Sequence, residues 1–129
     1  MAGENPFKVV AGVPDLFFAA RIGETARQLG VAIEFASSGP AVLEKASGAP
    51  SLVILDLGAA TLDPIKLIAQ LKADPGPDIA RVVGFVNHER TDLIEQAREA
   101  GCDQVLTRGA FTKDLPGLLT GAPLLRGLE

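Results

Sequence analysis

The chain has 129 residues, of which 47% are hydrophobic and 22% are charged, and its formal net charge is −4. This length suits one domain, and this composition excludes an intrinsically disordered chain. No apolar run approaches the roughly 20 residues that cross a bilayer, so we expect no membrane association. The first residues lack the basic and apolar segments of a signal peptide. The single cysteine, Cys102, excludes an internal disulfide, and we expect a cytoplasmic protein.

The composition also argues against nucleic-acid binding and against a metal centre. Nucleic-acid binding depends on clustered Lys and Arg side chains, whereas this acidic chain has scattered arginines and neither Trp nor Tyr. His88 and Cys102 are the only residues of their types, and a structural zinc site usually takes four nitrogen or sulfur ligands. We therefore predict no nucleic-acid partner and no cofactor.

Apolar runs that resemble strands alternate with segments of helical periodicity. The predicted strands cover residues 7–11, 31–35, 51–57, 81–86 and 103–106. The second run alternates between apolar and polar residues, as at a sheet edge. The third is continuously apolar over residues 52–57 apart from Asp56, which is typical of a central parallel strand with both faces covered.

Helices are predicted between these strands, with Gly and Pro marking their ends. The apolar face of the first helix is expected to comprise Phe18, Ile22, Ala26 and Leu29. The expected N-caps are Asp15, Asp63, Thr91 or Asp92, and Thr112. The last helix contains Pro116 and Gly117, so we expect it to be short or irregular. The adjacent Phe17 and Phe18 cannot both face one core, so one of them is expected at the surface.

Five strands that alternate with five helices predict one α/β domain over residues 1–129, with a core over about 7–119 and a tail over 120–129. We expect a three-layer, flavodoxin-like, doubly wound parallel sheet in the order 2-1-3-4-5. Ligands of such sheets bind at the carboxyl ends of the strands. The residues expected at this rim are Ala11, Gly12, Asp56, Gly58, Val86, Asn87, His88 and Arg108.

Asp56 is the most informative of these residues. A carboxylate within an apolar strand is costly unless it is paired, hydrogen-bonded or protonated. One interpretation is a strand-end aspartate that accepts hydrogen bonds from nearby backbone amides. The other is a reactive carboxylate at the ligand-binding rim.

The sequence resembles the receiver domain of two-component response regulators over about residues 7–119. The resemblance rests on LVILDL at 52–57, which is similar to the phosphoacceptor strand, and on AREAGCD at 97–103 with Arg108 seven residues past the glycine. It implies that Asp56 occupies the position that a histidine kinase phosphorylates. It also implies a backbone carbonyl ligand to Mg²⁺ at Gly58.

Several residues depart from the pattern of that family. The two acidic residues that bind Mg²⁺ after the first strand are replaced by Ala11 and Gly12. The Ser or Thr that contacts the phosphoryl group is Val86, and the Lys is Arg108. A guanidinium can meet a carboxylate through two parallel hydrogen bonds, so we expect Arg108 either to pair permanently with Asp56 or to face solvent.

We therefore predict a stand-alone receiver-like signalling domain that acts by protein–protein interaction, as a phosphorylation-independent pseudo-receiver. The expected partner is another signalling protein, or a second copy in a homodimer. By resemblance, its contact face is built by the fourth and fifth helices and carries Arg90, Arg98, Arg108 and Lys113.

Two other functions remain open. One is a working receiver that is phosphorylated on Asp56 in a phosphorelay and uses Mg²⁺. The other is a small-molecule sensor with a closed apolar pocket lined by Ala11, Val13, Val86 and His88. An enzyme is not expected, because His88 and Asp56 have no Ser or Cys nucleophile beside them at the rim.

Overall fold

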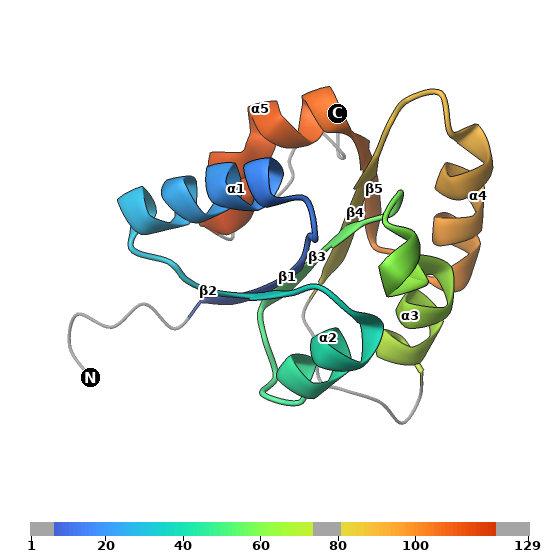
Figure 1. Ribbon diagram of the computed structural model, residues 1–129, viewed down its shortest axis with the longest axis horizontal. Helices are drawn as coiled ribbons and strands as arrows, with labels where there is room; N and C mark the ends of the chain where they lie inside the picture. The colour runs from blue at the N-terminus through green and yellow to red at the C-terminus, as the bar shows by residue number, and fades with distance from the viewer. Residues whose placement is uncertain (1–6, 74–80, 121–129) are drawn as a thin grey trace.

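The repeating unit of the fold is a parallel strand followed by a helix (Figure 1). The computed structural model describes residues 7–73 and 81–120, so the predicted tail beyond residue 120 lies outside the described residues. The strands are β1 (Lys8–Gly12), β2 (Ala32–Ala36), β3 (Leu52–Asp56), β4 (Val82–Val86) and β5 (Gln104–Thr107). The helices are α1 (Leu16–Leu29), α2 (Gly39–Ala46), α3 (Pro64–Leu71), α4 (Thr91–Ala100) and α5 (Arg108–Leu119), with a short 3₁₀ helix η1 (Ala60–Leu62) before α3.

The five strands form one parallel sheet in the order β2-β1-β3-β4-β5, which confirms the predicted winding. Every residue of β3 and β4 is buried, as their unbroken apolar runs indicate. β2 lies at one edge and exposes most of its residues, in agreement with its alternating pattern. Asp56 is the last residue of central β3 and pairs with Phe85 of β4.

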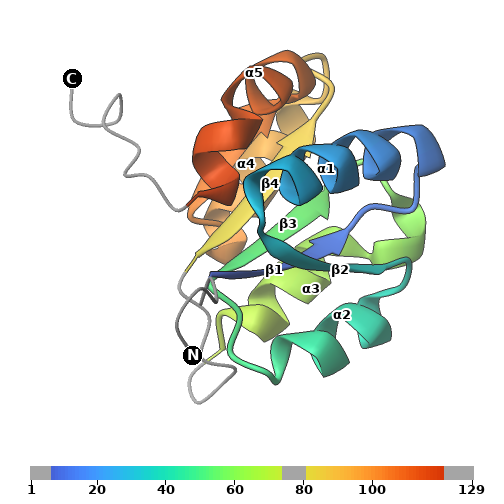
Figure 2. The ribbon, with the colours of Figure 1, turned by 90° about the vertical axis from the view of Figure 1, so that its left-hand side faces the viewer.

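Helices cover both faces of the sheet, with α1 and α5 on one face and α2, α3 and α4 on the other (Figures 1 and 2). The side chains of successive β3 residues point to the two faces of the sheet in turn. Ile54 joins the apolar cluster beneath α1 and α5, and Leu55 joins the cluster beneath α2, α3 and α4. Because side chains alternate along a strand, Asp56 points to the same side as Ile54, between α1 and α5.

The first helix ends largely as predicted. Asp15 caps α1, because its Oδ1 accepts a hydrogen bond from the backbone N–H of Phe18 at 3.0 Å. Gly30 ends the helix with a φ of 70°, a left-handed conformation that glycine adopts without strain. Leu29 was expected on the buried face and is instead 38% exposed, since it lies in the last turn at the edge of the core.

The predicted N-caps of the later helices hold only in part. Asp63 stands at the N-cap position of α3 before Pro64, as predicted, but its backbone is left-handed (φ 48°) and its side chain makes no capping hydrogen bond. The predictions of Thr91 or Asp92 for α4 and of Thr112 for α5 are wrong. Arg90 stands in the cap position of α4, which places Thr91 and Asp92 inside the helix. The hydroxyl of Thr107 accepts a hydrogen bond from the Ala110 amide at 3.2 Å, so α5 begins before Thr112. α5 has 12 residues and contains Pro116, so it is not short, which was one of the two alternatives expected for it.

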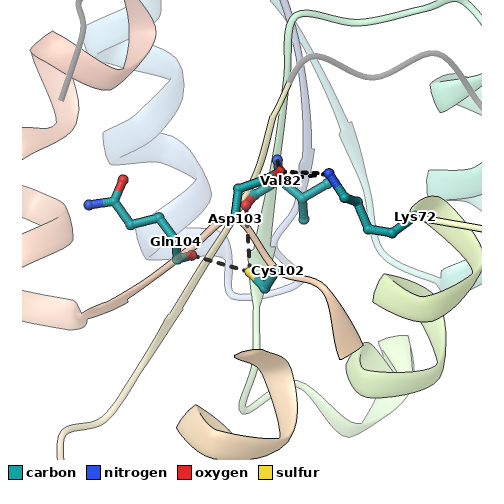
Figure 3. A network of polar contacts seen from close by, with 5 residues as sticks. All are labelled: Lys72, Val82, Cys102, Asp103 and Gln104. Atoms are coloured by element: carbon teal, nitrogen blue, oxygen red, sulfur yellow. Dashed lines mark hydrogen bonds and ion pairs between the residues drawn. The ribbon is translucent and has the colours of Figure 1, made fainter. Parts of the chain in front are cut away.

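A polar network joins α3 to the starts of β4 and β5, at the opposite edge of the sheet from Asp56 (Figure 3). Oδ2 of Asp103 accepts a hydrogen bond from the backbone N–H of Val82 at 2.7 Å and another from Nζ of Lys72 at 2.9 Å. The Cys102 thiol donates to the carbonyl groups of Val82 and Gln104. Burial raises the pKa of Cys102 to about 11, so this thiol is structural and poorly reactive.

The packing of Leu57 against β4 yields a first prediction. A Cβ at Gly84 would lie 2.9 Å from Cγ and both Cδ atoms of Leu57, which is closer than packed atoms approach. Gly84→Ala is therefore expected to lower the free energy of unfolding in urea by about 1–3 kcal/mol. Gly117→Ala in α5 is the matched control, because a Cβ there meets nothing within 4 Å. Equal effects of the two substitutions would show that Leu57 does not pack closely on Gly84.

The Asp103 network yields a second prediction, also for urea unfolding. Asp103→Ala leaves the Val82 N–H without its acceptor and is expected to lower the free energy of unfolding by about 1–3 kcal/mol. Asp103→Asn keeps an oxygen for that N–H and loses only the charge opposite Lys72. This substitution is therefore expected to lower the free energy of unfolding less than Asp103→Ala does. The ion pair is partly exposed and contributes little by itself. A loss as large for Asn as for Ala would mean that the ion pair dominates.

Candidate functional site

The site is centred on Asp56, a buried carboxylate at the carboxyl edge of the sheet. The residue is 5% exposed and is the only polar or charged residue in the buried part of the described chain. Its Oδ1 accepts a hydrogen bond from the backbone N–H of Gly58 at 3.0 Å. Asp56 therefore accepts a hydrogen bond from one nearby backbone amide, as one of the two interpretations expected. Its other oxygen, Oδ2, faces a different group.

That second group is the guanidinium of Arg108, the first residue of α5. Its Nη2 lies 3.7 Å from Asp56 Oδ2, which is an ion pair but exceeds hydrogen-bond length. The two parallel hydrogen bonds that we expected are therefore not formed. The Arg108 side chain is 45% exposed, so its charge is partly solvated while that of Asp56 is not.

The electrostatics of Asp56 reflect this unequal pairing. Burial raises the pKa of Asp56 above its ordinary value, and the Gly58 amide and the Arg108 charge only partly oppose that rise. The carboxylate of Asp15 raises the pKa of Asp56 further. Asp15 caps α1, as expected, and its position in the loop after β1 also lets its charge act on Asp56.

The positions that hold Mg²⁺ in receivers do not fit a metal here. Ala11 is 0% exposed, and a Cβ at Gly12 would lie 3.0 Å from Cδ2 of Leu55 and 3.1 Å from Cγ2 of Val42. Neither position has room for a carboxylate without repacking. Within residues 7–73 and 81–120, no three His, Cys, Asp or Glu side chains come together as a metal site requires.

Val86 is buried in the core, whereas Asn87 and His88 in the loop after β4 are exposed to solvent. Val86 is 2% exposed and packs in the cluster beneath α2, α3 and α4, whereas Phe85 packs on the Asp56 side. Asn87 forms a local turn, because its Oδ1 accepts a hydrogen bond from the Glu89 amide at 3.0 Å. His88 is exposed and, among the described residues, forms no ion pair with a carboxylate.

The pocket expected for a small-molecule sensor does not form from its predicted residues. Ala11 and Val13 are buried in one apolar cluster, Val86 is buried in the other, and His88 is exposed. An open hollow at this rim is lined by Asn87, His88, Thr107, Arg108 and Gly109.

A cluster of three phenylalanines beside Arg108 was not predicted. The ring centroids of Phe18 and Phe85 are 4.8 Å apart, and those of Phe85 and Phe111 are 4.6 Å apart. The guanidinium carbon of Arg108 lies 5.3 Å from the centre of the Phe18 ring. The inward placement of Phe18 was visible in its helical spacing. Its contact with residues about 70 and 90 positions later in the chain depends on the winding of the sheet.

Surface exposure separates the two adjacent phenylalanines of α1. Phe17 is 91% exposed and its neighbour Leu16 is 83% exposed, so the expectation that one of the two phenylalanines lies at the surface is confirmed.

None of the helices in the described part of the chain combines the length and apolar character of a membrane span.

The electrostatics of Asp56 yield a third prediction. A carboxyl group whose pKa is raised by folding contributes most to stability when protonated, and this contribution is lost as the pH rises from its ordinary value of 3.8 through the raised value. Asp56→Asn is neutral at every pH and keeps an oxygen for the Gly58 amide. Its stability relative to the unmodified protein, measured by urea unfolding, is therefore expected to increase with pH.

Asp92→Asn is the matched control for that experiment. The hydrogen bond from Arg90 lowers the pKa of the exposed Asp92, so removal of this carboxylate is expected to give a pH trend of the opposite sign. An Asp56→Asn variant that loses stability relative to the unmodified protein as the pH rises would mean that Arg108 outweighs burial.

Comparison of the sequence with known proteins gives little direct identification. No family model matches the chain. It is 30% identical over 110 residues to the bifunctional protein HldE of Desulfatibacillum aliphaticivorans, a match that covers 84% of this chain and 22% of HldE. The chain therefore spans about a fifth of the length of this curated relative, and the match assigns it no activity of HldE.

Solved structures resemble the chain much more extensively. A putative response regulator from Chloroflexus aurantiacus matches with a TM-score of 0.78 and 17% identity, over 91% of this chain and 97% of its own. The chemotaxis response regulator CheY4 of Vibrio cholerae matches with a TM-score of 0.76 and 15% identity, over 91% and 98% of the two chains. A response regulator from Burkholderia pseudomallei was solved with a phosphorylated aspartic acid, a calcium ion and citrate. It matches with a TM-score of 0.76 and 20% identity, over 95% of this chain and 69% of its own. The chain thus has the fold of a response-regulator receiver domain.

Proposed function

We propose that this chain is a receiver-like signalling domain that works through protein–protein contact and without phosphorylation of Asp56. The observation that carries the proposal is the pairing of the buried Asp56 with Arg108 at 3.7 Å, at a rim where two further carboxylates have no room. Arg108 supplies the positive charge that a receiver obtains from its metal ion and lysine.

The chemistry of phosphoryl transfer supports this proposal. Such transfer is catalysed mainly by positioning and by charge stabilisation around Mg²⁺. With Ala11 and Gly12 in place of the acidic pair, the metal lacks its carboxylate ligands. Val86 has no hydroxyl to donate to a phosphoryl oxygen, and its side chain is part of the core. A phosphoryl group on Asp56 would find neither its metal nor its hydrogen-bond donor.

Protein–protein contact is supported by what the helices leave uncovered. In α4 only Ala97 is buried, so most of this helix faces solvent. The cationic residues expected on the face of the fourth and fifth helices, Arg90, Arg98, Arg108 and Lys113, are all exposed. Arg90 pairs with Asp92 at 3.1 Å and Arg108 pairs with Asp56, so Arg98 and Lys113 are the members of this set that remain for an acidic partner surface. The match to a segment of HldE supports a module that operates within, or beside, larger proteins.

The proposal yields a fourth prediction, for amide NMR. Titration with Mg²⁺ and then with beryllofluoride, which mimics a phosphoryl group, is expected to leave the amide signals of Gly58, Asn87 and Arg108 unshifted. The reason is that the site offers neither the metal ligands nor the hydroxyl that hold this mimic. The chain with Asp56→Ala is the control for nonspecific effects of the ions.

Shifts that appear in the unmodified protein and vanish in Asp56→Ala would contradict the proposal. They would establish instead that Asp56 accepts a phosphoryl group, so that the chain is a working receiver. The same spectra report whether the variant is folded, because dispersed amide signals require a packed core.

A further inference from the structure

Arg108 occupies a position that its contact with Asp56 does not explain. The contact is 3.7 Å long, beyond hydrogen-bond distance, and the Arg108 side chain is 45% exposed, so solvent is an open alternative for its charge. A partly exposed ion pair is weak, and ordering a long side chain for it is entropically unfavourable. Some other group has to hold the guanidinium over the rim.

Two aromatic rings meet that requirement. The guanidinium carbon lies 5.3 Å from the centre of the Phe18 ring and 5.7 Å from the centre of the Phe85 ring. Both distances are within the range at which a cation is attracted to the negative face of an aromatic ring. Arg108 therefore touches the two rings and Asp56 at once.

The rings themselves are held in place by the fold. Phe85 is 0% exposed in β4, and Phe111, which stacks on it, is 1% exposed in α5. Phe18 is half-buried, and its backbone N–H is fixed by the Asp15 cap at 3.0 Å. Residues from α1, β4 and α5 thus form one rigid support beneath the guanidinium.

We propose that Phe18 and Phe85 are positioning residues that clamp the Arg108 guanidinium against Asp56. The clamp makes the pairing of Asp56 with a positive charge a property of the folded chain, without a metal ion or a phosphoryl group. The proposal rests on the Asp56–Arg108 contact that the proposed function also uses. It does not depend on whether Asp56 can be phosphorylated.

The fifth prediction tests this clamp by NMR, without Mg²⁺ or beryllofluoride. Phe18→Leu keeps an apolar side chain but removes the ring. The Arg108 guanidinium signals are expected to lose the shift that a nearby ring induces, and the titration midpoint of the Asp56 carboxyl carbon is expected to move to higher pH. The direction follows because Arg108 lowers the pKa of Asp56, whereas admission of water alone would relieve the burial that raises this pKa and would move the midpoint to lower pH.

The sign of this change separates the clamp from a simple disturbance of the Asp15 cap. Asp15 raises the pKa of Asp56, so its displacement would move the titration midpoint to lower pH. Arg108→Met gives the midpoint in the absence of the guanidinium, which sets the limit that Phe18→Leu approaches. Phe17→Leu is the matched control on the neighbouring, 91% exposed residue and is expected to change neither signal.

Two further variants keep the test decisive if Phe18→Leu does not fold. Phe18→Tyr retains an electron-rich ring and is expected to preserve both signals. Incorporation of 3,4,5-trifluorophenylalanine at position 18 keeps the ring shape but weakens its negative face, and is expected to reproduce the upward movement of the midpoint. An unchanged Asp56 titration with the fluorinated ring, which leaves the burial of Asp56 as it is, would overturn the clamp and leave the proposed function intact. Beryllofluoride binding would overturn the proposed function and leave the clamp intact.

Discussion

The buried carboxylate of Asp56 is the constraint on which the rest of the rim depends. It stands at the end of a strand that is buried on both faces, and a charge in such a place requires hydrogen bonds or an opposite charge. One backbone amide and one guanidinium provide these, and neither fully offsets burial, since the pKa of Asp56 remains raised. The residues around Asp56 are therefore best understood by how they balance this one charge.

The carboxylates at the two ends of the strands, Asp103 and Asp56, are paired differently. At the edge formed by the strand starts, Asp103 pairs with both a backbone amide and a lysine at hydrogen-bond distance. At the edge formed by the strand ends, Asp56 has one hydrogen bond, and its cationic partner lies farther away and faces solvent. The first edge is a closed structural junction. The second keeps a partly satisfied charge next to exposed residues.

The strands and their order could be predicted from the sequence because burial on both faces leaves an unbroken apolar run that no surface segment shows. Helix starts were harder to predict, because several Thr and Asp residues compete for each cap. The cap of α5 is Thr107, five residues before the predicted Thr112, and the helix contains Pro116 in its interior. The approach of Arg108 to Asp56 was one of two expectations for Arg108, and it followed from the resemblance to receiver domains, which aligns both residues with positions at the phosphoacceptor site. The rings beneath Arg108 did not, because aromatic contacts between distant elements leave no local pattern.

Three of the residues that differ from a receiver at the rim, Ala11, Gly12 and Arg108, together leave one cation opposite the charge of Asp56. A receiver gathers several carboxylates around a divalent cation, and a lysine completes the balance. Here one buried carboxylate faces one guanidinium, with Asp15 at the margin. A second carboxylate at Ala11 or Gly12 would be buried against apolar side chains with no cation to pair with it, because Arg108 is already engaged. Restoring the acidic residues one at a time would therefore weaken the fold before it could create a metal site. Arg108 and the small residues at the end of β1 are mutually dependent for this physical reason.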